Sequence, residues 1–212
     1  MTDARQASDD IRFMGRAIAL ARARMGQTWP NPAVGCVIVR DGEILAEAAT
    51  APGGRPHAEE QAVPAAGDRA RGATAYVTME PCGARSSGRT SCANFLMDAG
   101  VARVVVAAVD PSPFACGRGV DRLRKAGLRV ETGLLAQEAA VLYEGYLHRV
   151  ETGRPLVRVS DTGDGFDARF AASPKADLAT ELERLGEAGY TRVWVGPGDL
   201  AEALADQGLL AS

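Results

Sequence analysis

Three residues of this chain have the types and the spacing to hold a zinc ion. They are His57, Cys82 and Cys92, and Pro81 directly precedes the first cysteine. A catalytic zinc takes three protein ligands and keeps one position for water. Glu59 lies two residues after the histidine, where it can move protons rather than bind metal. The pattern predicts that a zinc-activated water attacks a substrate while Glu59 shuttles the protons, as in a zinc deaminase.

Two other interpretations of these residues stay open. In the first, His57 is an ordinary loop residue and the cysteines are small buried side chains. In the second, the zinc is structural, but a structural site usually takes four protein ligands. The chain has only two histidines and four cysteines. Of the other cysteines, Cys36 lies in an apolar segment and is expected in the core, and Cys116 lies in a turn and receives no role.

Length and composition restrict the class of protein. The chain has 212 residues, of which 46% are hydrophobic, and this suits one domain with a modest appendage. A net charge of −3 and an aromatic content of 5% argue against a nucleic-acid partner. No stretch approaches the roughly 20 apolar residues that span a bilayer, and the N-terminus has no apolar signal region. We therefore expect a soluble cytoplasmic protein with no membrane partner and no disulfide framework.

Strands and helices alternate along the chain. Helices are expected over 11–25 with a cap at Asp10, from His57 with a break or kink at Pro64, and over 91–98, 119–126 and 136–150. Strands are expected over 33–39 and 43–48, joined as a hairpin, and over 73–78, 103–109 and 128–131. This alternation predicts a three-layer α/β/α sandwich around a mixed, mostly parallel sheet. Both halves of the zinc pattern fall at strand-to-helix junctions, where helix N-termini help to keep thiolates ionised.

A linker at 152–155 divides the chain into residues 1–150, the expected zinc-dependent domain, and residues 151–212, a short tail. Strands at 156–160 and 192–195 and helices at 178–188 and 200–205 are expected in the tail. The tail is short for an independent α/β domain. We expect it to cover apolar surface of the first domain or to support an oligomer.

Residues 11–149 resemble the deaminase domain of the bacterial riboflavin-biosynthesis deaminase-reductases, the RibD or RibG type. The resemblance rests on motifs such as Pro30-Asn31-Pro32, Pro56-His57-Ala58-Glu59, Thr78-Met79-Glu80-Pro81-Cys82, Gly88-Arg89-Thr90 and Asp110-Pro111-Ser112-Pro113. It implies a cytidine deaminase-like sandwich, Zn²⁺ as the cofactor, and a homo-oligomer. It also implies hydrolytic removal of the exocyclic amine of a small-molecule substrate, a diaminopyrimidinone ribosylamino 5-phosphate. By the same resemblance Asn31 would hydrogen-bond this substrate, and Arg89 with Thr90 would meet its phosphate.

Two features depart from the family pattern. Thr50 and Ala84 stand where the family has histidines that contact the substrate, whereas the metal and proton-transfer residues are intact. The tail resembles two pieces of the family's reductase domain, at 155–167 and 182–210, but Pro197 interrupts the loop near the nicotinamide cofactor. The sequence therefore predicts a deaminase with a truncated reductase remnant that binds no nicotinamide cofactor. It leaves open a deaminase of another aminated pyrimidine or purine, and a non-catalytic paralogue stabilised by zinc.

Overall fold

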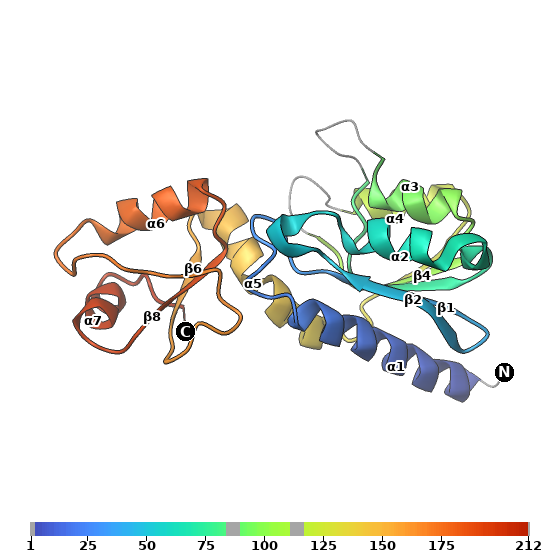
Figure 1. Ribbon diagram of the computed structural model, residues 1–212, viewed down its shortest axis with the longest axis horizontal. Helices are drawn as coiled ribbons and strands as arrows, with labels where there is room; N and C mark the ends of the chain where they lie inside the picture. Colours follow the sequence, from blue (N-terminus) through green and yellow to red (C-terminus); the bar gives the residue numbers. More distant parts are fainter. Residues whose placement is uncertain (1–2, 84–89, 111–116, 212) are drawn as a thin grey trace. The chain divides into compact units, whose positions relative to one another are not determined.

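The computed structural model describes residues 3–83, 90–110 and 117–211, and it consists of two compact units (Figure 1). The first unit comprises Met1–Ala23, Val34–Ala51 and Pro56–Val141. The second comprises Arg24–Ala33, Pro52–Arg55 and Leu142–Ser212. Two loops from the N-terminal half therefore belong to the second unit, and the division is not a single cut in the chain.

A five-stranded sheet forms the centre of the first unit. Its strands, in spatial order, are β2 (Glu43–Ala49), β1 (Gly35–Arg40), β3 (Thr74–Met79), β4 (Arg103–Ala108) and β5 (Arg129–Thr132). β1 is antiparallel to both β2 and β3, whereas β3, β4 and β5 run parallel to one another. The predicted mixed sheet and its opening hairpin are confirmed. Half of the pairings are antiparallel, more than expected, because the hairpin inserts β1 between β2 and β3.

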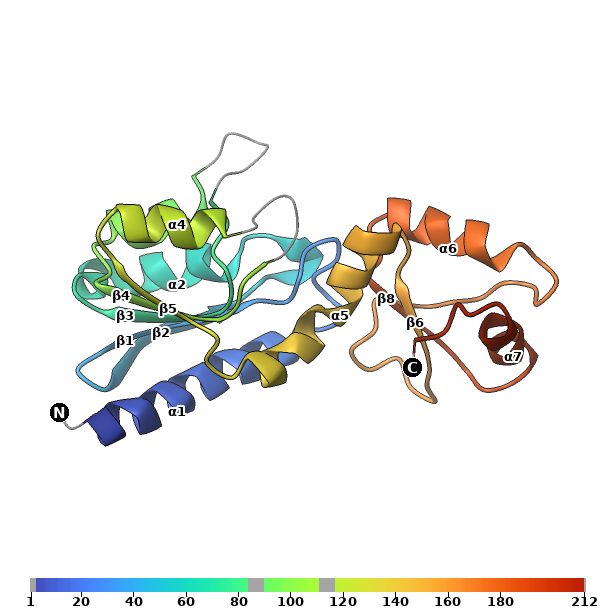
Figure 2. The same cartoon turned by 180° about the vertical axis from the view of Figure 1, so that it is seen from behind.

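Helices cover both faces of this sheet, as predicted for a three-layer sandwich (Figures 1 and 2). On one face lie α2 (Ala58–Ala66), α3 (Cys92–Asp98) and α4 (Arg118–Lys125), and on the other lies α1 (Asp3–Arg22). Alternate strand residues form one core cluster with α2, α3 and α4, among them Cys36, Ile38, Val77, Val104 and Val106. The expected core position of Cys36 is confirmed.

Two helix predictions are wrong. Asp10 does not cap a helix, because α1 begins at Asp3 and Asp10 lies inside it. The Asp10 carboxylate is buried and pairs with Arg103 at 2.7 Å, so a residue type that favours caps is used here for an internal ion pair. Pro64 does not break α2, which continues to Ala66. Because the helix ends two residues later, Pro64 removes only one hydrogen bond, between its own position and the carbonyl oxygen of Glu60.

The second unit has its own sheet of three parallel strands, in the order β6 (Leu156–Val159), β8 (Arg192–Val195) and β7 (Ala168–Arg169). The short strand β7 was not predicted. α5 (Ala136–Thr152) enters this unit from residue 142, and α6 (Leu178–Glu187) and α7 (Asp199–Asp206) follow. The tail has a hydrophobic core of its own, which its length did not suggest, formed by Val157, Phe170, Leu178, Leu182, Val193, Val195, Ala201 and Leu204.

Candidate active site

His57, Cys82 and Cys92 lie together in the first unit, as the sequence predicts. Their potential ligand atoms all lie within 4.8 Å of one another. The Nδ1 atom of His57 is 3.3 Å from the Sγ atom of Cys92, and the backbone N–H of Cys92 donates to the Sγ atom of Cys82 at 3.3 Å. Two of the three donor atoms lie at helix starts, and the third lies on the segment that follows β3. The three thus converge at one place.

His57 is held in place by the first turn of α2. The residue is the N-cap of this helix, in an extended conformation, and the Glu60 carboxylate accepts its backbone N–H at 2.8 Å. The Gln61 amide donates to the carbonyl oxygens of Ala49 at 2.7 Å and of Pro56 and His57 at 3.2 Å each. These contacts fix the approach of the chain to His57 and thereby the position of its imidazole.

Cys82 and Cys92 are joined at the start of α3. Ser91 caps this helix, and its hydroxyl accepts the N–H of Asn94 at 3.3 Å. The next two N–H groups of the chain both point at Cys82, since Ala93 donates to its carbonyl oxygen at 3.2 Å and Cys92 donates to its sulfur. N–H groups at a helix start favour negative charge, so this end of α3 favours the thiolate form of Cys82.

The donor set fits zinc. For a tetrahedral zinc, the ligand distances place a nitrogen and a sulfur about 3.6 Å apart, close to the 3.3 Å between His57 and Cys92. One imidazole and two thiols are ligands of the kind that zinc prefers in catalytic sites with three protein ligands. Neither of these two cysteines forms a disulfide. Three protein ligands leave one coordination position for a reacting molecule.

Glu59 lies beside this group, on the first turn of α2. Its side chain is only 2% exposed. Burial raises the pKa of the carboxyl above its ordinary value, and the charge of His57 opposes that rise without cancelling it. The carboxyl also lies within hydrogen-bonding reach of Cys92. A buried carboxyl with a raised pKa next to a metal site is suited to take up a proton and release it again.

His57, Cys82 and Cys92 lie in a segment that matches a known sequence family. Residues 7–108 match the family described as the cytidine and deoxycytidylate deaminase zinc-binding region. Residues 7–108 therefore belong to this deaminase family. The cofactor of the site is therefore Zn²⁺, in agreement with the donor set.

The relatives of this chain point to one branch of the family. Riboflavin biosynthesis protein RibD from Escherichia coli (strain K12) is 48% identical over 163 residues, which are 76% of this chain and 44% of the relative. The protein of the same name from Actinobacillus pleuropneumoniae is 45% identical over 209 residues, which are 96% of this chain and 54% of the relative. The chain spans about half the length of these curated relatives.

A solved structure confirms the fold. Acinetobacter baumannii RibD (form 2) superposes with a TM-score of 0.82 at 27% identity, over 97% of this chain and 85% of that one. The likeness extends beyond the deaminase sheet, since so large a share of the chain includes most of the second unit. Among the described residues, no helix is both long enough and apolar enough to cross a membrane.

The residues expected to contact the substrate lie in different parts of the chain. Asn31 lies in the second unit, where its Nδ2 group donates to the carbonyl oxygen of Gly54 at 3.0 Å. Thr90 is exposed on the segment that leads into α3. Arg89 and Ala84 lie outside the described residues. The structure thus gives surroundings for Asn31 and Thr90.

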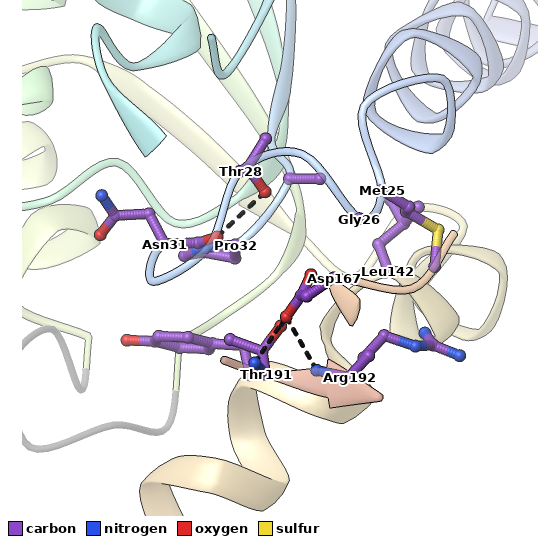
Figure 3. Close-up of a pocket in the computed structure, with 11 residues that line it drawn as sticks. Met25, Gly26, Thr28, Asn31, Pro32, Leu142, Asp167, Thr191 and Arg192 are labelled. Carbon is purple, nitrogen blue, oxygen red and sulfur yellow. Dashed lines mark hydrogen bonds between the residues drawn. The ribbon is translucent and has the colours of Figure 1, made fainter. Parts of the chain in front are cut away.

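Asn31 lines a pocket of the second unit (Figure 3). Its walls come from the loop at 25–33, from Leu142 and Tyr146 on α5, and from the region around Asp167. Figure 3 shows the Asp167 carboxylate, whose Oδ2 atom accepts the N–H of Thr191 at 2.6 Å and that of Arg192 at 2.9 Å. Asp167 therefore fixes the start of β8 at this pocket.

Two further features of the site were not predicted from the sequence. Thr50, which replaces a family histidine, is buried, and its hydroxyl accepts the N–H of Val34 at 3.0 Å. The side chain thus closes the end of the β1–β2 ladder. Glu80 is buried beside the ligand segment and accepts several backbone N–H groups. Its place in the motif before Pro81 and Cys82 was visible in the sequence, but nothing there gave its partners.

Proposed function

We propose that this chain is a zinc-dependent hydrolase that removes the exocyclic amine of the diaminopyrimidinone ribosylamino 5-phosphate of riboflavin biosynthesis. The observation that carries the proposal is the buried carboxyl of Glu59 beside the convergent His57, Cys82 and Cys92. Those four residues form the proposed catalytic site, with three as zinc ligands and Glu59 as the proton carrier. The substrate is proposed because relatives 45% and 48% identical are named riboflavin biosynthesis proteins.

The reaction consumes one water and releases one ammonia. Zinc, when bound, supplies a Lewis acid that activates a water molecule. Glu59 takes a proton from this water while the water oxygen bonds to the ring carbon that carries the amine. The carboxyl gives that proton to the neighbouring ring nitrogen and later carries the second proton to the amine. The carbon–nitrogen bond then breaks, ammonia leaves, and the ring carbon keeps the oxygen as a carbonyl. Glu59 is placed to hold a proton between these transfers, because its buried carboxyl lies beside the proposed zinc ligands.

Substrate recognition is part of the same proposal. Arg89 would bind the 5-phosphate, for which a guanidinium fork has the right geometry, and Thr90 would add a hydroxyl beside it. Asn31 would hydrogen-bond the ring through the part of its amide that does not donate to Gly54. Thiolate ligands for zinc need cysteines that stay reduced, which suits a reducing compartment, so we place the enzyme in the cytoplasm. Assembly into a homo-oligomer, with no nucleic-acid partner, completes this proposal.

A second candidate function is deamination of a different aminated ring. Thr50 favours it, because a hydroxyl that hydrogen-bonds the backbone of Val34 stands where the resembling family offers a histidine to its substrate. The residues that bind the substrate ring would then differ from those of the resembling family, while the hydrolytic residues stay the same. Cytidine, cytosine and guanine are the rings to test.

The deciding experiment is ammonia release by the zinc-loaded protein. The diaminopyrimidinone ribosylamino phosphate is compared with cytidine, cytosine and guanine at equal concentrations. Turnover of the riboflavin intermediate alone supports the first proposal, and turnover of another ring alone supports the second. A zinc-loaded protein that releases no ammonia from any of them would contradict the first proposal and would leave a further aminated ring or a non-catalytic paralogue.

The tail enters the proposal only as a segment that resembles part of a reductase. The match to the Actinobacillus pleuropneumoniae relative covers 96% of this chain, which supports common descent of residues 151–212 as well. Pro197 stands in the loop between β8 and α7 and removes one backbone N–H from it. We therefore propose that residues 155–212 bind no nicotinamide cofactor, and titration with NADPH while its fluorescence is recorded tests this.

A further inference from the structure

Glu80 lies two residues before Cys82, and its buried carboxylate accepts hydrogen bonds from four backbone N–H groups. Its Oε1 atom accepts from Gly119 at 2.8 Å and from Val120 at 3.1 Å. Its Oε2 atom accepts from Gly117 at 3.0 Å and from Asp110 at 3.3 Å. The side chain is only 5% exposed. One carboxylate thus joins the end of β4 to the start of α4.

The start of α4 also packs directly on the residues around Cys82. A Cβ atom on Gly119 would lie 1.8 Å from the carbonyl oxygen of Pro81, so the helix backbone touches the ligand segment there. A Cβ atom on Gly83 would lie 3.1 Å from the backbone of Arg118. Arg122 donates from Nη1 to the carbonyl oxygen of Gly83 at 3.1 Å. The residues on both sides of Cys82 are therefore in contact with α4.

The backbone before Cys82 has little freedom of its own. The N–H of Glu80 donates to the carbonyl oxygen of Ala108 at 2.8 Å, which continues the β3–β4 pairing. Pro81 then fixes one of its two backbone dihedrals through its ring. The position of the Cys82 sulfur follows from where the Glu80 side chain and α4 hold this short segment.

We propose that Glu80 is a positioning residue for the metal site, which docks α4 on the Pro81–Gly83 segment and so sets Cys82 for zinc. The inference rests on the proposed ligand set, because it acts through Cys82 and touches neither zinc nor substrate. Residues that orient metal ligands commonly change metal affinity 10- to 100-fold when replaced. A glutamine at this position keeps the size of the side chain but turns an NH₂ group toward N–H donors, so two of the four contacts are lost.

The test compares wild-type protein with the Glu80→Gln variant in zinc competition against a chromophoric chelator. The expected result is a 10- to 100-fold lower zinc affinity in the variant. Cobalt substitution gives a second readout, because the Co²⁺ absorption bands report on the geometry of the ligand set. The bands of Glu80→Gln are expected to shift, since the Cys82 sulfur is displaced. Equal zinc affinity and identical cobalt spectra in the two proteins would overturn the proposal.

Tyr76→Phe is the matched control for a loss of stability alone. The Tyr76 hydroxyl donates to Asp10 at 2.6 Å, a buried contact on the same strand β3 but toward α1 rather than α4. This variant is expected to melt earlier with its zinc affinity and cobalt spectrum unchanged. If it loses zinc as strongly as Glu80→Gln at a similar melting temperature, the effect is general destabilisation and the proposal fails.

Arg122→Ala keeps the test decisive if Glu80→Gln does not fold. It removes only the contact between α4 and the Gly83 carbonyl, and a severalfold loss of zinc affinity is expected from it. Unchanged affinity in Arg122→Ala would then overturn the docking role of α4. A wild-type protein that binds no zinc is a separate outcome, because it refutes the proposed ligand set and with it the proposed function.

Discussion

The Nδ1 atom of His57 lies 3.3 Å from the Sγ atom of Cys92, although the two residues are 35 positions apart in the chain. Each stands at the start of a helix, His57 as the N-cap of α2 and Cys92 as the first residue of α3. Both helices lie on the same face of the five-stranded sheet (Figure 1). The sheet therefore brings two helix starts together, and Cys82 joins them from the segment that follows β3.

Replacing either cysteine ligand by serine is expected to abolish tight zinc binding. Cys82→Ser and Cys92→Ser each remove one of three thiol or imidazole donors, and a hydroxyl is a poor ligand for zinc. The zinc content of the purified variants, measured by atomic emission, is expected to fall from one ion per chain to near zero.

Cys36→Ser is the control for the two ligand variants. Cys36 lies fully buried in the apolar core, where a hydroxyl without a new partner costs about 1–3 kcal/mol of stability. It is expected to lower the melting temperature and to leave one zinc per chain. Loss of zinc from Cys36→Ser, or retention by Cys92→Ser, would contradict the proposed ligand set.

Glu59→Gln is expected to separate catalysis from metal binding. An amide cannot carry the proton, so kcat for ammonia release should fall by about 10²- to 10⁴-fold. The zinc content should stay at one ion per chain, because Glu59 is not one of the proposed ligands. A drop in kcat of less than about tenfold would exclude Glu59 as the proton carrier.

Glu43→Gln is the control for Glu59→Gln, because it makes the same chemical change at an exposed position. Glu43 starts β2, and its side chain is 67% exposed in a surface pair with Arg69. Surface pairs of this kind contribute little to stability. Its kcat is therefore expected to equal that of the wild-type enzyme, so an effect of Glu59→Gln reflects its place rather than the loss of a carboxylate.

The convergence of His57, Cys82 and Cys92, the proposed zinc ligands, could be predicted from the sequence because metal chemistry restricts residue type and spacing. A site of three ligands needs histidine or cysteine, and the chain has few of either. The strands of the first unit were equally visible, since apolar runs such as residues 104–108 indicate burial on both faces. Sequence spacing alone therefore indicated both the sandwich and the two junctions at which the ligands lie.

Side-chain partners could not be predicted in the same way. Asp10 has a residue type that favours helix caps, yet it pairs with Arg103, 93 positions away, inside α1. Glu80 is one of many acidic residues until the fold brings the N–H groups of α4 to it. The position of Asn31 in the second unit also depends on tertiary structure, because its loop joins residues more than a hundred positions later. Long-range partners of this kind leave no periodic signal in the sequence.

Acid is expected to destabilise the first unit through Asp10. Burial alone would raise the pKa of this carboxyl, but hydrogen bonds from Arg103 and Tyr76 and the charge of Arg103 outweigh burial and hold it below 3.8. A carboxyl with a lowered pKa in the folded state contributes stability above its unfolded value, and this contribution is lost as the pH falls through the folded value. The free energy of unfolding, measured by urea titration, should therefore decline below about pH 4.

Asp10→Asn should remove that part of the pH dependence and lower stability at neutral pH. The variant leaves the buried Arg103 with Glu131 as its remaining partner at 2.7 Å. Breaking a buried pair from one side costs about 3–5 kcal/mol, and the remaining partner favours the lower end of that range. If Asp10→Asn unfolds at the same urea concentration as the wild-type protein at pH 7, the pair does not stabilise α1 on the sheet.

Two glycines of the first unit are expected to respond in opposite directions to the same substitution. A Cβ atom on Gly35 at the start of β1 would lie 2.0 Å from the carbonyl oxygen of Ala17, so α1 would have to move away from the sheet. Gly35→Ala should therefore cost about 3 kcal/mol. Gly15 lies inside α1 with nothing within 4 Å of such an atom, and Gly15→Ala should stabilise the protein by about 0.5–1 kcal/mol. Thermal unfolding of both variants checks the pair, and a stable Gly35→Ala would show that α1 does not pack on β1 as closely as described.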